Sequence, residues 1–214
     1  MPRVSFDESS GVLLLVSGAT QTARVDGAVG HLIVPTQWSQ RTKAQLRPGQ
    51  WAIDNFAFKH FDTAAFLRTL EHFHDIPGCL FASAPDVVAD AAATRVLWPF
   101  WSKVIRGVGL TPAFVLQDGI AADQVPWDEG IAIFVGGSTA FKEGPVARSL
   151  MGLAKARGLW VHVGRVNGRR RFQMMRLAGA DSIDGSGYSL APDTNIPKVA
   201  AWRAEDDRQP RLLQ

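Results

Sequence analysis

The sequence contains very little cysteine: Cys79 is the only one among 214 residues. A single thiol cannot form an internal disulfide, and no cluster of cysteine and histidine residues has the spacing of a zinc site. This scarcity favours a reducing cytoplasm over an oxidising compartment. The sequence therefore predicts a cytoplasmic protein that holds no metal and needs no cofactor.

Long apolar runs and strong charge of one sign are also missing. No apolar stretch reaches the ~18 residues that a membrane span needs. The opening segment MPRVSFDESSG lacks the apolar region of a signal peptide. The net charge is only +3, with a pI near 9.3, which permits a nucleic-acid partner without requiring one. We therefore expect no membrane association.

What the sequence does contain is enough apolar material for one core. Hydrophobic residues make up 46% of the chain and charged residues 20%, which is typical of a globular protein rather than a disordered one. No internal repeat, low-complexity segment or linker divides it. We expect one catalytic domain over residues 1–214, with a polar, flexible tail from about Glu205.

Short apolar runs alternate with helical patterns along the chain. The expected strands are 12–16, 31–35, 51–58, 79–86, 112–119, 131–138, 159–166 and 181–187, and the expected helices are 62–75, 90–109, 145–158 and 169–180. Continuous apolar strands that alternate with helices indicate a parallel sheet covered on both faces. We predict an α/β fold, a compact (β/α)₈ TIM-type barrel in which some helices are short or missing. A doubly wound open sheet is the alternative.

Polar residues and glycines gather where the predicted strands end. They are Asp54, Asn55, Asp86, Gln117, Asp118, Gly136, Gly137, His162, Arg165 and Asp184. In a barrel these ends meet at one mouth, where catalytic groups lie. Because an isolated buried aspartate is costly, several at one place suggest a solvated, functional cavity. Asp181, by contrast, is expected at the start of the last strand.

Most of these residues also have a purely structural explanation. Asp86 could cap a helix, Asp118 could belong to a turn, Gly136 and Gly137 could form a tight turn, and His162 with Arg165 could be a surface pair. The basic run Arg169, Arg170 and Arg171 could likewise be the solvated start of a helix. The structural explanation is weaker for Asp54 and Asp184, because no lysine or arginine adjoins either one in the sequence. The collective pattern carries more weight than any single member.

Several segments, in order, match a known set of motifs. DNFAF keeps the Asp and Phe of an Asp-Ser-Gly-Gly-Phe motif, with Phe56 and Ala57 in place of its glycines, and GADSIDG has the form of Gly-Val-Asp-Met-Phe-Asp. ASAPD, FVLQDG and FVGGS lie between them in the same order. The chain thereby resembles the tRNA-guanine transglycosylase superfamily, most closely the DNA-modifying 7-deazaguanine transglycosylases of bacteria and phages.

The resemblance implies a pentosyltransferase. It would exchange guanine in a polynucleotide for a 7-deazaguanine base such as preQ0, through a covalent aspartyl-nucleotide intermediate. Asp184 would attack C1′ and Asp54 would transfer the proton. The base would be bound by Phe58, Asp86, Gln117, Gly136 and Gly137. Further nucleic-acid or base contacts would come from His162, Arg165, Arg169, Arg170 and Arg171.

The implied partners are a polynucleotide and a free 7-deazaguanine base, in a bacterial or phage-infected cell. The chain is shorter than the tRNA enzymes and lacks their zinc ligands, which favours DNA over tRNA. A helper protein for target recognition is left open. One alternative is a phosphate-binding TIM-barrel enzyme for a small phosphorylated metabolite, since Gly136-Gly137 and Gly185-Ser186-Gly187 lie where late barrel loops bind phosphate. The other is a non-catalytic nucleic-acid-binding barrel.

Overall fold

The computed structural model describes residues 11–18, 29–127 and 129–207. The segment that argued against a signal peptide, residues 1–10, lies outside this range. So does the end of the polar tail, residues 208–214.

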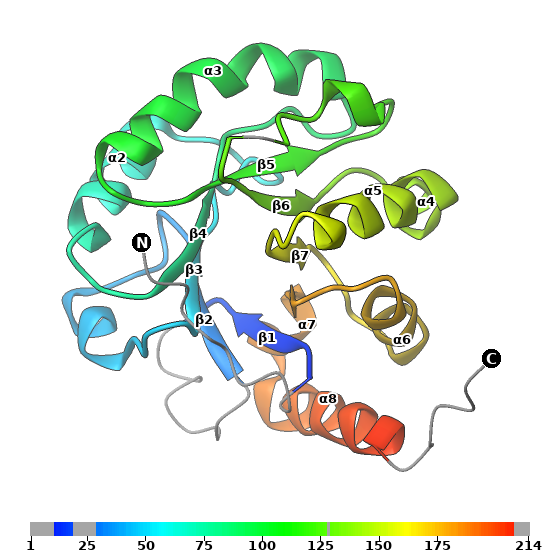
Figure 1. Ribbon diagram of the computed structural model, residues 1–214. Coiled ribbons are helices and arrows are strands. Elements are labelled where there is room, and N and C mark those ends of the chain that lie inside the picture. Colours follow the sequence, from blue (N-terminus) through cyan, green and yellow to red (C-terminus); the bar gives the residue numbers. More distant parts are fainter. Residues whose placement is uncertain (1–10, 19–28, 128, 208–214) are drawn as a thin grey trace.

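Eight parallel strands form a closed barrel in chain order (Figure 1). They are β1 (Leu13–Val16), β2 (Val29–Ile33), β3 (Trp51–Ile53), β4 (Cys79–Ser83), β5 (Pro112–Leu116), β6 (Ala132–Val135), β7 (Val161–Val163) and β8 (Ser182–Ile183). The ring closes because Leu14 of β1 pairs with Ile183 of β8. This confirms the predicted barrel and excludes the open sheet.

Most of the helices lie on the outside of the barrel (Figure 1). The described helices are α2 (Thr63–Phe73), α3 (Ala91–Gly107), α4 (Thr139–Glu143), α5 (Pro145–Ala156), α6 (Arg169–Leu177), α7 (Ser186–Leu190) and α8 (Pro192–Asp207). Among the described residues, short 3₁₀ turns, η2 (Gln40–Gln45) and η3 (Ala122–Gln124), take the place of helices between β2 and β3 and between β5 and β6. In this part of the chain some connections therefore lack a helix, as the length predicts. Within the described part of the chain, no helix is long and apolar enough to cross a membrane.

An aspartate side chain caps the start of both α2 and α3. The Asp62 side chain accepts a hydrogen bond from the Ala65 amide at 2.9 Å, as expected for the start of α2. Asp90 accepts one from the Ala93 amide at 2.9 Å at the start of α3. Each cap satisfies an amide that has no partner within its helix, and so fixes where the helix begins.

The strand residues divide into two apolar layers. In β1, Leu13 and Leu15 belong to a cluster inside the barrel, whereas Leu14 and Val16 belong to the layer between strands and helices. This period of two is the geometry of a strand. The interior cluster is completed by Leu32, Ala52, Phe81, Ala113 and Ala132.

Several strands end sooner than the sequence predicts. The strand expected over 51–58 ends at Ile53, and Phe56 turns the chain with a positive φ of 64°. The strand expected over 79–86 ends at Ser83. The apolar residues that follow β3 are loop residues, and Phe58 is 57% exposed. The polar residues that follow these strands therefore lie in loops at one end of the barrel.

Candidate active site

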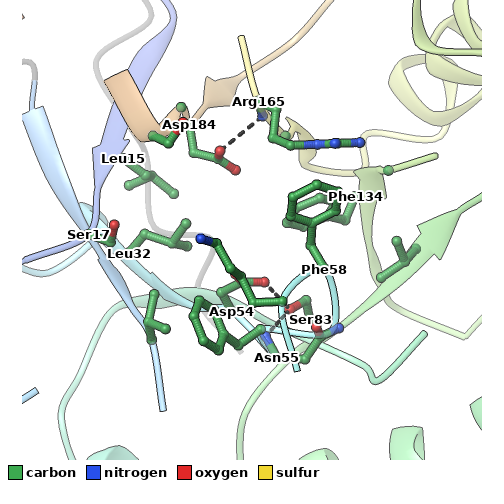
Figure 2. Close-up of a pocket in the computed structure, with 18 of the residues that line it drawn as sticks. Leu15, Ser17, Leu32, Asp54, Asn55, Phe58, Ser83, Phe134, Arg165 and Asp184 are labelled. Carbon is green, nitrogen blue, oxygen red and sulfur yellow. Dashed lines mark hydrogen bonds between the residues drawn. The ribbon is translucent and has the colours of Figure 1, made fainter. Parts of the chain in front are cut away.

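A cavity of about 510 Å³ opens at the carboxyl end of the barrel (Figure 2). Its lining includes eight of the residues predicted from the sequence: Asp54, Phe58, Asp86, Gln117, Gly136, Gly137, Arg165 and Asp184. The loops after six different strands supply them. This is the end of a (β/α)₈ barrel where active sites are found.

Asp54 lies directly after β3 and continues its ladder, since its amide donates to the Ile33 carbonyl at 2.9 Å. The Ser83 hydroxyl donates to its carboxyl oxygen Oδ1 at 3.3 Å. Burial, followed by the negative charges of Asp184 and Asp86, raises the pKa of Asp54 to about 7. Near neutral pH the carboxyl group is therefore present in both its protonated and its ionised form, which suits a group that transfers protons.

Asp86 is held between two side-chain amides. Its Oδ1 accepts from Asn55 Nδ2 at 2.7 Å and its Oδ2 from Gln117 Nε2 at 2.5 Å. The amides are themselves oriented, because Asn55 Oδ1 accepts from the Ala57 amide and Gln117 Oε1 accepts from the Ala89 amide. Burial raises the pKa of Asp86, and the two amide donors act in the opposite direction. The result is a fixed acceptor in the cavity wall.

Asp184 follows β8 and is bound at both oxygens. Its Oδ1 accepts from the Arg165 backbone amide at 2.9 Å, as the dashed line in Figure 2 marks. Its Oδ2 lies 2.9 Å from His162 Nε2. A Cβ atom on Gly164 would come within 2.9 Å of the Phe134 ring and 3.5 Å of Asp184 Oδ2. Glycine at this position leaves the space that the Phe134 ring needs beside the carboxyl group.

Two cations line the other part of the cavity. The Arg165 guanidinium lies over the Phe58 ring, 4.0 Å from its centroid, and its Nη2 donates to the Gly137 carbonyl at 2.6 Å. Lys142 is 1% exposed and donates from Nζ to the Gly164 carbonyl at 3.0 Å. Burial, and then the charge of Arg165, lowers the pKa of Lys142 to about 8. The lining therefore combines a carboxylate-rich part with a cationic part.

Close packing explains the double glycine after β6. A Cβ atom on Gly136 would lie 2.8 Å from Gln117 Nε2 and 2.8 Å from the Val115 side chain. Gly137 has a φ of 74°, and a Cβ atom there would lie 2.5 Å from Asp118 Oδ2. Because neither glycine has a side chain, the turn can approach the Gln117 amide closely.

Other predicted site residues lie away from the cavity. His162 is inside the barrel, 0% exposed, and approaches the cavity through its contact with Asp184. Arg169, Arg170 and Arg171 begin α6 and do not line the cavity. Arg170 and Arg171 pair with Glu143 at 3.0 and 2.8 Å.

Asp181 and Asp118 have structural partners. Asp181 lies at the start of β8, where it pairs with Lys155 at 2.6 Å and accepts from the Val161 amide at 2.7 Å. Asp118 accepts from the Ser138 hydroxyl at 2.5 Å and thereby joins the loop after β5 to the turn after β6. The two acids of GADSIDG thus belong to opposite ends of the barrel.

Sequence reasoning overlooked three residues of the site. Asn55 was noted only as a strand-end residue, although it orients Asp86. Ser83 and Lys142 carried no signal, because a serine in a strand and a lysine in a short helix are common. Only the fold reveals that Lys142 is buried. Among the described residues, no group of three or more His, Cys, Asp or Glu side chains is placed to hold a metal ion.

Comparison with known proteins finds a structural match but no sequence match. No protein-family model matches the chain, and no curated protein matches it. Solved structures do match, among them one titled "Native KDPGal structure". It is 12% identical, with a TM-score of 0.52, over 90% of this chain and 90% of that chain. At this identity the match shows the barrel fold.

These findings correct the family assignment. The predicted membership of the tRNA-guanine transglycosylase superfamily is wrong: no family model or curated sequence supports it, and the structural match reported above has a different title and shares only the fold. The pentosyltransferase assignment is wrong with it, because it rested on that resemblance. The physical reason is that acids and glycines recur at the strand ends of any (β/α)₈ barrel that has a functional site there. The order of these residues along the sequence therefore reflects the barrel topology rather than one family. The DNA or tRNA partner and the free base stay untested predictions.

Proposed function

We propose that the chain is an enzyme that acts on a small polar metabolite and uses Asp54 and Asp184 as its acid–base pair. The observation that carries this proposal is the raised pKa of Asp54, about 7, in a cavity that also contains Asp184. Two carboxyl groups in one site can take different roles when their surroundings differ. Here one is buried beside negative charge, and the other faces two nitrogen atoms.

In this proposal Asp54 donates a proton to the substrate and Asp184 accepts one. Asp54 is suited to the acid role because its pKa lies near the operating pH, where general acid catalysis is most efficient. Asp184 is suited to the base role because the Arg165 amide fixes one oxygen and His162 faces the other. Both carboxyl groups line the cavity into which a substrate would fit (Figure 2).

The lining also indicates the class of substrate. Asp86 offers acceptor oxygens, so the substrate would present hydroxyl or amino groups to it. Phe58 and Phe134 supply ring faces, and Gln117, Gly136 and Gly137 complete that wall. Lys142 and Arg165 would face an anionic group, which supports a phosphorylated or carboxylated metabolite. A molecule with donor groups at one end and an anion at the other matches both parts of the cavity.

A binding and turnover screen tests the proposal. The purified protein is screened by thermal shift against sugar phosphates, sugar acids and free purine bases, and conversion of each ligand is followed by proton NMR. We expect a ligand from the first two groups. Turnover should fall by about 10²–10⁴-fold in Asp54→Asn and in Asp184→Asn, because each removes a proton-transfer group.

Asp181→Asn is the matched control, because Asp181 belongs to the same segment but lies at the far end of β8. It should keep the turnover of the unmodified protein. The proposal is overturned if Asp54→Asn or Asp184→Asn turns over the ligand normally. A panel in which only purine bases bind would overturn the substrate class.

A further inference from the structure

We infer that a buried chain of hydrogen bonds from Trp160 through Ser182 to His162 fixes the imidazole in the tautomer that donates to Asp184. His162 is then a positioning residue: it does not line the cavity, but it sets the orientation of a carboxyl group that does. The inference rests on the proposed role of Asp184.

The chain lies inside the barrel, between its last two strands. His162 of β7 and Ser182 of β8 are register partners, and both are 0% exposed. The imidazole packs between the rings of Phe81 and Phe134, with centroids 5.1 and 4.7 Å away. In such surroundings each polar hydrogen needs a protein partner, because leaving it unsatisfied is costly.

Counting donors assigns the protons. The Trp160 indole nitrogen can only donate, so Ser182 Oγ accepts from it at 2.9 Å. The hydroxyl proton of Ser182 then points to His162 Nδ1, also at 2.9 Å. With Nδ1 as an acceptor, the neutral ring carries its proton on Nε2 and donates it to Asp184 Oδ2 at 2.9 Å.

The other protonation states fit less well. If Nδ1 carried a proton, as in the imidazolium ion or the second neutral tautomer, Ser182 Oγ would accept two hydrogen bonds. Its own proton would then have no acceptor among the side-chain contacts described for it. In the second neutral tautomer the bare Nε2 would also face a carboxylate oxygen, acceptor against acceptor.

The second oxygen of Asp184 is fixed independently. Lys142 Nζ donates to the Gly164 carbonyl, and the N–H of the same peptide unit, that of Arg165, donates to Asp184 Oδ1. One oxygen is therefore held through a peptide group and the other through an imidazole. Together they prevent the carboxyl group from rotating, so it keeps one orientation in the cavity.

NMR of labelled protein tests this without any substrate. The unmodified protein is labelled with ¹⁵N-histidine and with ¹³Cγ-aspartate, and His162→Gln and Asp184→Asn assign the signals. We expect a protonated-type Nε2 and a bare-type Nδ1 for His162 at neutral pH. In Ser182→Ala the Nδ1 resonance should move toward the value of a nitrogen without a hydrogen bond, and the Asp184 carboxyl resonance should shift.

Ser182→Thr keeps the hydroxyl and should restore both resonances. His31 of β2, which β1 separates from β8 in the ring, is the internal reference and should not move. A protonated Nδ1 in the unmodified protein, or unchanged His162 and Asp184 resonances in Ser182→Ala, would overturn the inference. Because the readout needs no turnover, a failure of the proposed enzymatic function would leave these results intact and be recognised separately.

Discussion

The pKa of Asp54 shows how the surroundings of a single side chain can change its chemistry. Burial and two neighbouring carboxyl groups disfavour its ionised form, and the Ser83 hydroxyl and the Phe56 amide offset this only in part. A residue chosen for stability alone would not be placed there, because burying a carboxyl group among others costs folding free energy. Such a penalty is typical of a residue that is kept for its chemistry.

The first prediction concerns how stability depends on pH through Asp54. Its pKa rises from 3.8 to about 7 on folding, so between these values the native state holds more protons than the unfolded state. The free energy of unfolding should therefore fall as pH rises through this window and should level off above it. Asp54→Asn removes this contribution, and urea unfolding of both proteins across the window measures it.

Asp75→Asn provides a control of opposite sign. A hydrogen bond from Lys43 lowers the pKa of Asp75, so its small contribution is present above the ordinary pKa of aspartate and disappears at lower pH. An Asp54→Asn protein that loses stability with pH just as steeply as the unmodified protein would contradict the assignment of the raised pKa to Asp54.

At the scale of helices and strands, the sequence predicts most of the barrel. The strands were recognisable as short apolar runs because they are buried on both faces. The helix expected over 62–75 corresponds to α2, which Asp62 caps. The last two helices, α7 and α8, were not predicted. Proline occurs at both Pro192 and Pro197 of α8, and the apolar pattern there is weak. Tertiary contacts of Ile196 and Val199, both buried, hold α8 in place.

The sequence predicted the strand-end residues of the site but not the residues that orient them. Asp54, Asp86 and Asp184 follow apolar strands, and topology then brings them to one cavity. The partners of these acids come from loops or from a neighbouring strand, as Asn55 and Ser83 do, and no local pattern marks them. The resemblance to a family misled because strand-end acids are a property of the barrel rather than of one reaction.

The second prediction concerns the start of α3. Asp90→Ala removes the acceptor for the Ala93 amide and should lower the free energy of unfolding by about 1 kcal/mol. Asp90→Asn keeps an acceptor of the same length and should lose much less. Urea unfolding of the two variants measures the difference. Equal losses would show that the Asp90 charge, rather than the cap, stabilises the helix.

The sheet of the molecule is a closed ring, so the stability of its first strand and that of its last strand depend on each other. β1 pairs with β8, and the Arg203 side chain of α8 donates to the Val12 carbonyl just before β1. Ser17 and Ser189 are also in hydrogen-bond contact, 172 residues apart in the sequence. Each of these contacts joins the first strand region to the last elements of the described chain.

The third prediction follows from this closure. Ile196→Ala in α8 creates a cavity at a residue that is 3% exposed and should cost about 2–5 kcal/mol. Because α8 contacts the region where the ring closes, the variant should still unfold in one transition at a lower temperature. Calorimetry measures both quantities. Lys198→Ala, at an exposed position of α8, should change little, and two separate transitions in Ile196→Ala would contradict the coupling.

The pairing of β1 with β8 also has a consequence for synthesis of the chain. A ribosome makes β1 well before β8, so the nascent chain has no partner for the free edge of β1 on that side until residue 183 has emerged. Unpaired strand edges are templates for aggregation. Until β8 has emerged this edge is open to aggregation, so a pause in elongation between β7 and β8 would be more harmful than a pause just after β1.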